Sequence, residues 1–239
     1  MTDLSKTLFI PLYFKYKESI GRKKIYDDIA VDFFEKNLEK LKEFSEIDKD
    51  TLSFERIISR TIIIDKIIIE ILNNNNIDYV INMGCGLDFR NRRLNLNIPW
   101  YNIDLEPVID YRHKYFSKYS NEYDISGDMF SLDYGLFSGK RCGLFIFEGI
   151  LMFFSEEEVI RILTNVKSKI TNAYFIIHSF PEEDDVIPSI ASISKKSIIK
   201  WRMNNPKFIE KEVNIKHLQK YNLTKPNTQI DFMVNLYKY

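Results

Sequence analysis

The sequence of 239 residues has few of the side chains that build disulfide frameworks and metal sites. It contains two cysteines, Cys85 and Cys142, and three scattered histidines, and neither set has the spacing of a zinc site. Lysine plus arginine and aspartate plus glutamate both total 34, so no net charge draws the chain toward nucleic acid. We therefore expect no bound metal and no nucleic-acid partner.

Long apolar runs are missing as well. No stretch approaches the roughly 18 apolar residues that indicate a membrane-spanning helix. Residues 8–14 are apolar, but Pro11 interrupts them and the segment is too short for a signal peptide. We expect no membrane partner, and a reducing cytoplasm is the default location.

Residues 1–72 have the pattern of helices. Within 26–44 the apolar residues recur close to the helical period. Residues 61–72 are rich in isoleucine, and their charges, Asp65, Lys66 and Glu70, fall on one side of a helix. This predicts a largely buried helix that leads into the first strand.

After residue 76, short apolar stretches alternate with longer amphipathic ones. We expect strands over 79–83, 101–103, 123–125, 143–147 and 174–177, with helices over 107–118, 155–170 and 187–203. Ser155 and Glu158 have the spacing of a capping box at the start of one helix. Strands that alternate with helices indicate an α/β fold with a parallel sheet and helices on both faces.

The C-terminal part has a different pattern. A short helix is predicted over 214–221, and extended segments over 223–225 and 229–237 flank Pro226 and Asn227. A turn between two extended segments indicates an antiparallel hairpin that closes the sheet.

A glycine turn follows the first predicted strand. Gly84 and Gly86 permit a tight turn and let a ligand approach the backbone. A dinucleotide fingerprint needs a third glycine three residues after the second, where Phe89 stands here. The turn therefore suits a nucleoside ligand without a pyrophosphate better than NAD, although an ordinary strand-end turn would also fit.

Asp104 ends the second predicted strand. An acidic residue about 20 positions beyond a glycine turn can accept hydrogen bonds from both ribose hydroxyls. Asp104 could instead cap the helix that follows it. The glycine turn upstream favours the ribose role.

Three ordered motifs resemble the leucine carboxyl methyltransferase family, which also holds tetracenomycin-type polyketide O-methyltransferases. They are Gly84–Arg90 followed by Arg93 and Leu94, then Ile103–Ile109, then Phe147–Phe154. Arg60 and Thr61, followed by Asp65, resemble the family's Arg-Thr element before the first strand. The resemblance is clearest over residues 55–170. It implies S-adenosylmethionine as cofactor and a Rossmann-like class I methyltransferase sheet, mostly parallel with a C-terminal antiparallel hairpin. We expect this domain over 56–239, after an N-terminal helical cap or lid over 1–55.

The resemblance also implies a set of cofactor-binding residues. Arg60 would bind the methionyl carboxylate through two parallel hydrogen bonds, although a helix-end charge is the alternative. Gly84 and Gly86 would lie under the methionyl and ribose portion, and Asp104 would hold the ribose.

Three further residues complete this implied set. Asp128 would accept a hydrogen bond from the adenine amine and Met129 would pack on the ring, although Gly127 with Asp128 also has the signature of a turn. Glu148 would lie near the cofactor ammonium and the substrate opening, because a carboxylate after a buried strand must be paired or hydrated.

Candidate residues on the substrate side come from three regions. His178, at the end of the fifth predicted strand, is the candidate general base, and a purely structural histidine is the alternative. Tyr13 belongs to aromatic N-terminal helices that we expect to form a substrate lid. Phe153 stands where the family has a tyrosine. If the lid is correct, deletion of residues 1–20 should damage turnover more than cofactor affinity.

Three arginines are further candidates on the substrate side. They could steer an anionic substrate or be solvated: Arg92, Arg93 and Arg112.

The leading hypothesis is an O-methyltransferase acting on a hydroxyl or carboxylate of a small molecule. One alternative is carboxyl methylation of a protein or peptide C-terminus. An NAD-dependent oxidoreductase is disfavoured by Phe89 and by the closing hairpin, and a non-catalytic cofactor-binding module is the remaining alternative. No oligomeric state is predicted.

Overall fold

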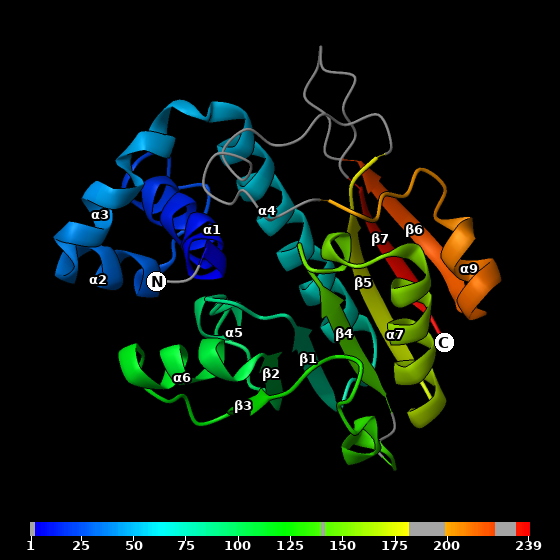
Figure 1. The fold of residues 1–239 in the computed structure, drawn as a ribbon. Coiled ribbons are helices and arrows are strands. Elements are labelled where there is room, and N and C mark those ends of the chain that lie inside the picture. The colour runs from blue at the N-terminus through cyan, green and yellow to red at the C-terminus, as the bar shows by residue number, and fades with distance from the viewer. Residues whose placement is uncertain (1–2, 140–141, 182–198, 223–232) are drawn as a thin grey trace. The chain divides into compact units, whose positions relative to one another are not determined.

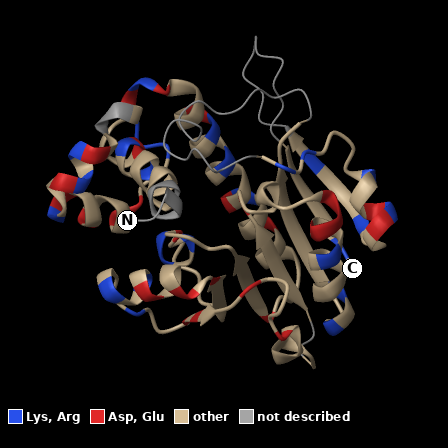
Figure 2. Cartoon of the chain, in the orientation of Figure 1, with Lys and Arg blue, Asp and Glu red and all other residues tan. Residues whose placement is uncertain are grey.

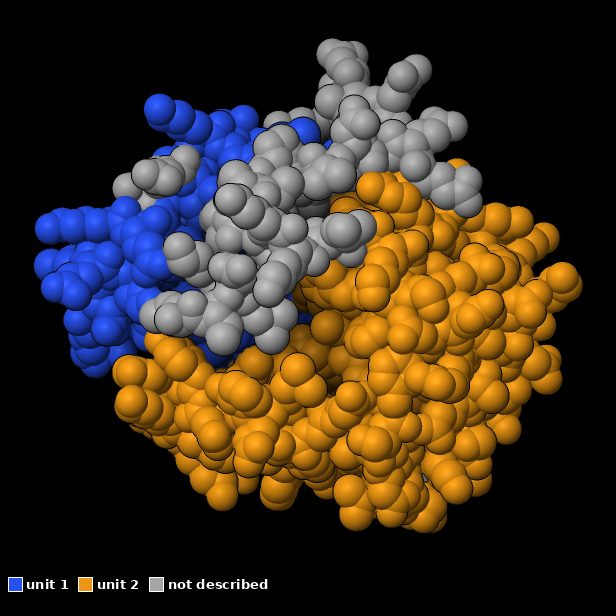
Figure 3. Space-filling model, viewed as in Figure 1, with its two compact units in different colours: residues 1–65, 86–96, 185–198 blue, residues 66–85, 97–184, 199–239 orange. Residues whose placement is uncertain are grey.

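The computed structural model describes residues 3–139, 142–181, 199–222 and 233–239. The chain divides into two compact units (Figure 3). The described residues of unit 1 fall within 1–65 and 86–96, and those of unit 2 within 66–85, 97–184 and 199–239. Our own division, a cap over 1–55 and a catalytic domain over 56–239, stays a prediction. Acidic and basic residues are interspersed along the helices (Figure 2).

Unit 1 is helical, as predicted for residues 1–72. Its elements are α1 (Asp3–Ile20), α2 (Asp28–Lys36), α3 (Leu38–Phe44), the 3₁₀ helix η1 (Ser45–Lys49), the first part of α4 (Thr51–Asn74) and the short α5 (Arg90–Arg93) (Figure 1). The segment predicted over 26–44 forms two helices, because the backbone leaves helical geometry at Asn37. The Asn37 side-chain amide donates to the Phe33 carbonyl 2.7 Å away and helps to end α2.

Aromatic side chains fill the interior of unit 1. The buried set comes from α1, α2 and α3, with ring centroids 5.2 to 6.4 Å apart: Phe9, Tyr13, Phe14, Tyr16, Phe33, Phe34 and Phe44. Each ring brings a large apolar area out of water and packs edge-on or tilted against its neighbours. The short helices of this unit are therefore held by shared aromatic packing.

Unit 2 is a seven-stranded sheet in the order β3-β2-β1-β4-β5-β7-β6. The strands are β1 (Tyr79–Met83), β2 (Trp100–Asp104), β3 (Glu122–Ser126), β4 (Gly143–Phe147), β5 (Ala173–Ser179), β6 (Lys216–Asn222) and β7 (Met233–Lys238). The first five are parallel, and β7 is antiparallel to both β5 and β6. This confirms the predicted α/β fold with a closing antiparallel hairpin.

Helices cover the sheet. They are α6 (Glu106–Tyr115), α7 (Glu156–Lys169) and α9 (Lys207–Val213), with the 3₁₀ helices η2 (Tyr134–Phe137) and η3 (Leu151–Phe153). Alternate side chains of β1, β4 and β5 form one apolar core with α7, α9 and η2. On β5, Tyr174 alternates with these positions, and its hydroxyl donates to Asn75, just beyond α4, at 2.6 Å.

The capping box predicted for α7 is present. The Ser155 side chain accepts from the Glu158 backbone N–H, and the Glu158 carboxylate accepts from the Ser155 N–H at 2.8 Å. Both bonds satisfy donors that a helix start would otherwise leave without a partner. Val159, Ile162 and Leu163 of α7 are then buried against the sheet.

The helix predicted over 214–221 is wrong. Asn214 adopts the left-handed conformation and ends α9, and the chain then forms β6. This edge strand is largely exposed and polar, so it lacks the apolar alternation that reveals a strand. Of the helix predicted over 187–203, residues 187–198 lie outside the described residues and 199–203 are not helical. The segment predicted over 223–225, and the start of the one over 229–237, also lie outside them.

Within the described part of the chain, no helix is long and apolar enough to cross a membrane. Over the same residues, no cluster of histidine, cysteine, aspartate and glutamate could hold a metal ion.

Candidate cofactor site

The strand order contains a switch point between β1 and β4. From β1 the chain proceeds to β2 and β3 on one side, whereas β4 and β5 lie on the other. In sheets of this kind, ligands bind beyond the carboxyl ends of the strands at such a point. Met83 and Phe147 are register partners at those ends, so Gly84 and Glu148 follow neighbouring strands directly.

Position 84 requires a glycine because of its backbone conformation and because Ile150 lies close to it. Its φ is +62°, in the region that favours glycine, and a Cβ there would lie 2.5 Å from Cγ1 of Ile150. The space that Gly84 leaves is therefore taken by Ile150, which follows β4. This packing ties the loops after β1 and β4 together on the two sides of the switch point.

Cys85 is buried in the turn that follows β1. Its N–H donates to the Ile103 carbonyl of β2 at 3.1 Å. Arg112 of α6 is 1% exposed, and its Nε lies 3.3 Å from Asp124. Burial lowers the pKa of Arg112, but the Cys85 thiol and Asp124 outweigh it, and the pKa rises above its usual range. Arg112 is thus a buried, paired cation, and the prediction that it is solvated is wrong.

Asp104 ends β2 with its side chain half-buried. Its Oδ1 accepts from the Leu105 N–H at 2.8 Å, and its carbonyl accepts from Gly127 at 2.9 Å. Helix α6 has Leu105 as its N-cap and receives no side-chain cap, so the capping alternative for Asp104 is wrong. The carboxylate lies at the strand end where a ribose contact was predicted.

The segment after β3 forms a turn that orients Asp128. The exposed Asp128 carboxylate accepts from the Phe130 N–H at 2.8 Å. Met129 is 7% exposed and belongs to the apolar core, and its carbonyl accepts from the Tyr134 hydroxyl at 2.9 Å. The turn signature and the predicted adenine contacts are therefore compatible.

The other predicted residues of unit 2 lie at the ends of β4 and β5. Glu148 and Phe153 are half-buried, directly after β4 and in η3 respectively. His178 is 1% exposed within β5, and its ring packs edge-on against Phe180 with centroids 5.0 Å apart. Their roles toward cofactor and substrate stay predictions.

Three predicted residues belong to unit 1. Arg60 is half-buried in α4, and Gly86 has a φ of +50°. Tyr13 is 1% exposed among the aromatic rings, and its hydroxyl donates to Asp48 at 2.6 Å. Burial and the Asp48 carboxylate raise the pKa of Tyr13. The structure thus places Tyr13 in an aromatic core, and its predicted substrate contact stays a prediction.

Sequence reasoning missed a buried ionic network in unit 1. Six side chains, three cations and three carboxylates, come from α1, the start of α2, α4 and the segment after Gly86: Lys15, Asp27, Asp65, Asp88, Arg90 and Arg93. Each of these side chains is at most 15% exposed. The sequence motifs include Asp65, Asp88 and Arg93, but no sequence pattern indicates that these side chains are buried in one ionic network.

Two pairs of contacts connect the network. Asp88 accepts Lys15 Nζ at 2.6 Å on one oxygen and has Arg90 Nε at 2.9 Å from the other. Arg93 binds Asp65 with two guanidinium nitrogens, and its Nε lies 3.5 Å from Asp27. Burial alone would raise the pKa of Asp88, but Arg90, Lys15 and Arg93 outweigh it and hold the pKa well below its usual range.

Comparison with known families identifies the chain. The family model described as leucine carboxyl methyltransferase matches residues 17–167, more than half of the sequence. The chain belongs to the leucine carboxyl methyltransferase family. This confirms the predicted family, and the chain is an S-adenosylmethionine-dependent methyltransferase.

Solved structures share the methyltransferase's fold at low identity. A protein of Thermobifida fusca YX described as a methyltransferase is 14% identical, with a TM-score of 0.50 over 68% of this chain and 73% of that one. Magnesium protoporphyrin IX methyltransferase of Synechocystis PCC 6803 is 10% identical, with a TM-score of 0.52 over 77% and 85%. LepI is 14% identical, with a TM-score of 0.49, and the match spans 69% of this chain but 43% of LepI. A search of curated proteins finds no match.

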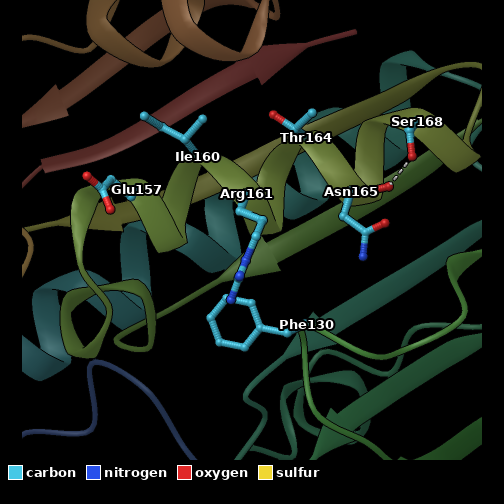
Figure 4. A pocket seen from close by; sticks show the side chains of 7 residues that line it. All are labelled: Phe130, Glu157, Ile160, Arg161, Thr164, Asn165 and Ser168. Carbon is cyan, nitrogen blue, oxygen red and sulfur yellow. Dashed lines mark hydrogen bonds between the residues drawn. The ribbon is translucent and has the colours of Figure 1, made fainter.

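A surface pocket of about 560 Å³ lies along α7 of the methyltransferase (Figure 4). It is lined by Phe130, Glu157, Ile160, Arg161, Thr164, Asn165 and Ser168. The Arg161 guanidinium lies 4.3 Å from the centroid of the Phe130 ring. The pocket thus adjoins the turn that holds Asp128 and Met129, on the outer side of α7.

Proposed function

We propose that this methyltransferase transfers a methyl group from S-adenosylmethionine to a hydroxyl or carboxylate oxygen of a small molecule. The observation that carries the proposal is the set of groups at the switch point. Gly84, Asp104 and Glu148 follow or end three adjacent parallel strands, β1, β2 and β4, at their carboxyl ends. A glycine turn between two carboxylates suits a nucleoside with a ribose and an ammonium group.

The residues present fit this cofactor, which supplies a sulfonium methyl group to a nucleophile. The half-buried Asp104 carboxylate would accept hydrogen bonds from the ribose hydroxyls, and Glu148 would pair with the ammonium. Asp128, held by its bond from the Phe130 N–H, would accept from the adenine amine beside Met129. Arg60 would bind the methionyl carboxylate.

The acceptor determines whether a base is needed. A carboxylate is already ionised at neutral pH, whereas a hydroxyl benefits from a group that removes its proton. His178 lies near the carboxyl end of β5, directly after Ile177, the register partner of Phe147, and is the candidate for that role. Phe153 would contribute an apolar contact to the acceptor.

A protein or peptide C-terminus is the second candidate acceptor, because the family description names a leucine carboxyl group. The two acceptors differ in size and in the need for a base. A small molecule is favoured because the Synechocystis protein, which shares the fold, is named for a small-molecule substrate.

The cofactor assignment is tested by calorimetry with S-adenosylmethionine and with NAD. We expect binding of the first only, and strong loss of affinity in Arg60→Ala and Asp104→Asn. Asp110→Asn, an exposed aspartate on α6, is the matched control and should bind like the wild type. Unchanged binding in both site variants would remove these residues from the cofactor site.

The acceptor is tested by transfer of a labelled methyl group to three panels: phenols and alcohols, small carboxylic acids, and peptides ending in leucine. Labelling of a small molecule supports the proposal, and labelling of the peptides alone contradicts it. For a hydroxyl acceptor, His178→Gln should abolish the rise of kcat between acid and neutral pH. An unchanged pH profile would exclude His178 as the base.

A further inference from the structure

Helix α1 contacts the second half of the glycine turn at two points within unit 1. Lys15 Nζ lies 2.6 Å from Asp88 Oδ1, and the Lys15 side chain is 3% exposed. About two helical turns before Lys15, Leu8 makes the second contact: a Cβ on Gly86 would lie 3.4 Å from Cδ2 of Leu8. A charged contact and an apolar contact therefore both fix the segment 86–88 against the same helix.

Asp88 is held from two sides. Oδ1 accepts from Lys15, and Oδ2 lies 2.9 Å from Arg90 Nε, which is itself 3.6 Å from Asp65 of α4. A carboxylate bound through both oxygens has a fixed position and orientation. Because Asp88 is two residues beyond Gly86, its position restricts the backbone of the turn.

The geometry points to Lys15 as a positioning residue for the cofactor: through Asp88 it fixes the turn that follows Gly84 and so sets the affinity for S-adenosylmethionine. This inference rests on the proposed assignment of Gly84 and Gly86 to the cofactor site. A turn that is ordered before the ligand arrives loses less conformational freedom on binding, and this favours affinity. Lys15 acts through Asp88 and has no direct role in methyl transfer.

This role differs from that of a substrate lid. A lid formed by the N-terminal helices predicts that loss of α1 reduces turnover more than cofactor affinity. Positioning by Lys15 predicts the reverse order, because the first effect falls on the cofactor turn. Cofactor affinity without any acceptor present therefore separates the two roles.

The test is a double-mutant comparison on the full chain. Lys15→Met, Asp88→Asn and the double variant are compared with the wild type by calorimetry with S-adenosylmethionine and by denaturant unfolding. Lys17→Met is the matched control, since Lys17 is on the same helix and pairs with Asp48 at the surface, 3.2 Å away. No methyl acceptor enters the assay, so failure of the proposed acceptor class does not change its outcome.

We expect each single variant to bind S-adenosylmethionine more weakly by on the order of tenfold or more. Loss of a supporting contact lets the binding group that it holds move out of position. The double variant retains two cations and two carboxylates in the network, so its unfolding midpoint should recover toward the wild type. Its affinity should stay low, because the turn is still untethered. The control should remain within about twofold of the wild type.

Two results would overturn the inference. In the first, affinity recovers in the double variant together with stability, which would make the ion pair purely structural. In the second, all variants bind like the wild type. If a single variant does not fold, the double variant decides between these outcomes, because it leaves no additional unbalanced charge.

Discussion

The largest buried clusters that distinguish the two units differ in kind. Unit 1 buries an ionic network of three cations and three carboxylates in addition to a cluster of aromatic rings. In unit 2, the main core between the sheet and α7, α9 and η2 consists of apolar and aromatic side chains. An apolar core is non-directional and depends on filled volume, whereas a buried network depends on every partner being present. The ionic network of unit 1 should therefore respond to changes of charge, and the apolar core of unit 2 to changes of volume.

The largest effect is expected from Arg93→Met in unit 1. Removal of this guanidinium leaves Asp65 and Asp27 buried without their main cation, and loss of one partner of a buried pair costs about 3–5 kcal/mol of stability. Lys36→Met is the control, because its pair with Asp32 is exposed and exposed pairs contribute about 0–1 kcal/mol. Denaturant unfolding measures both. Equal losses of unfolding free energy in the two variants would show that the buried ion pairs stabilise the protein no more than the exposed pair does.

A similar but smaller loss is expected from Leu163→Ala in unit 2. Leu163 of α7 is fully buried in the apolar core, and such truncations cost about 2–5 kcal/mol through lost transfer energy and the cavity left behind. Leu136→Ala, at a side chain that is 60% exposed, should change stability by less than about 0.5 kcal/mol. Leu163→Met, which keeps the volume, should recover most of the loss. Failure of that recovery would contradict a volume-dependent core.

The pH dependence distinguishes the units further. The pKa of Asp88 is held well below its usual range, so its stabilising effect is complete above the unfolded-state value of about 4 and is lost as the pH falls further. The wild type should therefore lose stability more steeply below about pH 4 than Asp88→Asn, which lacks this group. Unfolding free energies measured between acid and neutral pH give the comparison. Parallel curves would show that Asp88 has no depressed pKa.

Most of the fold could be predicted because unit 2 follows local patterns. Buried strands such as β1 and β4 are continuous apolar runs, and both predicted ranges match the structure. The pattern failed at β6, because this edge strand is exposed and carries polar side chains. Its extended conformation is identified by its pairing with β7. Such pairing is non-local, and no window of sequence contains it.

The candidate site was predictable only in part. Gly84 and Asp104 were placed at strand ends by the order of strands and by spacing, and the structure has them there. The tether between Lys15 and Asp88 joins residues 73 positions apart in the sequence, and a lysine in a helix gives no sign of being buried. Asp65 was expected on the charged side of its helix, but it is 7% exposed and paired with Arg93. Charge partners of this kind become visible only when helices are packed together.

The smallest effect is expected at the cap of α7 in unit 2, and the cap of α2 in unit 1 gives the comparison. The Ser155 hydroxyl caps α7 by accepting from the Glu158 N–H at 3.3 Å, so Ser155→Ala should cost about 1 kcal/mol. Asp27 caps α2 by accepting from the Ala30 N–H at 3.0 Å, and it also faces Arg93. Asp27→Ala should therefore cost more than Ser155→Ala, because it removes a cap and a buried charge partner together.

Asp27→Ser separates these two contributions, since serine keeps the cap and removes the charge. If the network stabilises unit 1, Asp27→Ser should still lose stability relative to the wild type. The expected loss is the stability lost in Asp27→Ala minus the contribution of the helix cap. Denaturant midpoints of the three variants give this difference directly. An Asp27→Ser variant as stable as the wild type would mean that the 3.5 Å approach of Arg93 to Asp27 adds nothing, and the network would then end at Asp65.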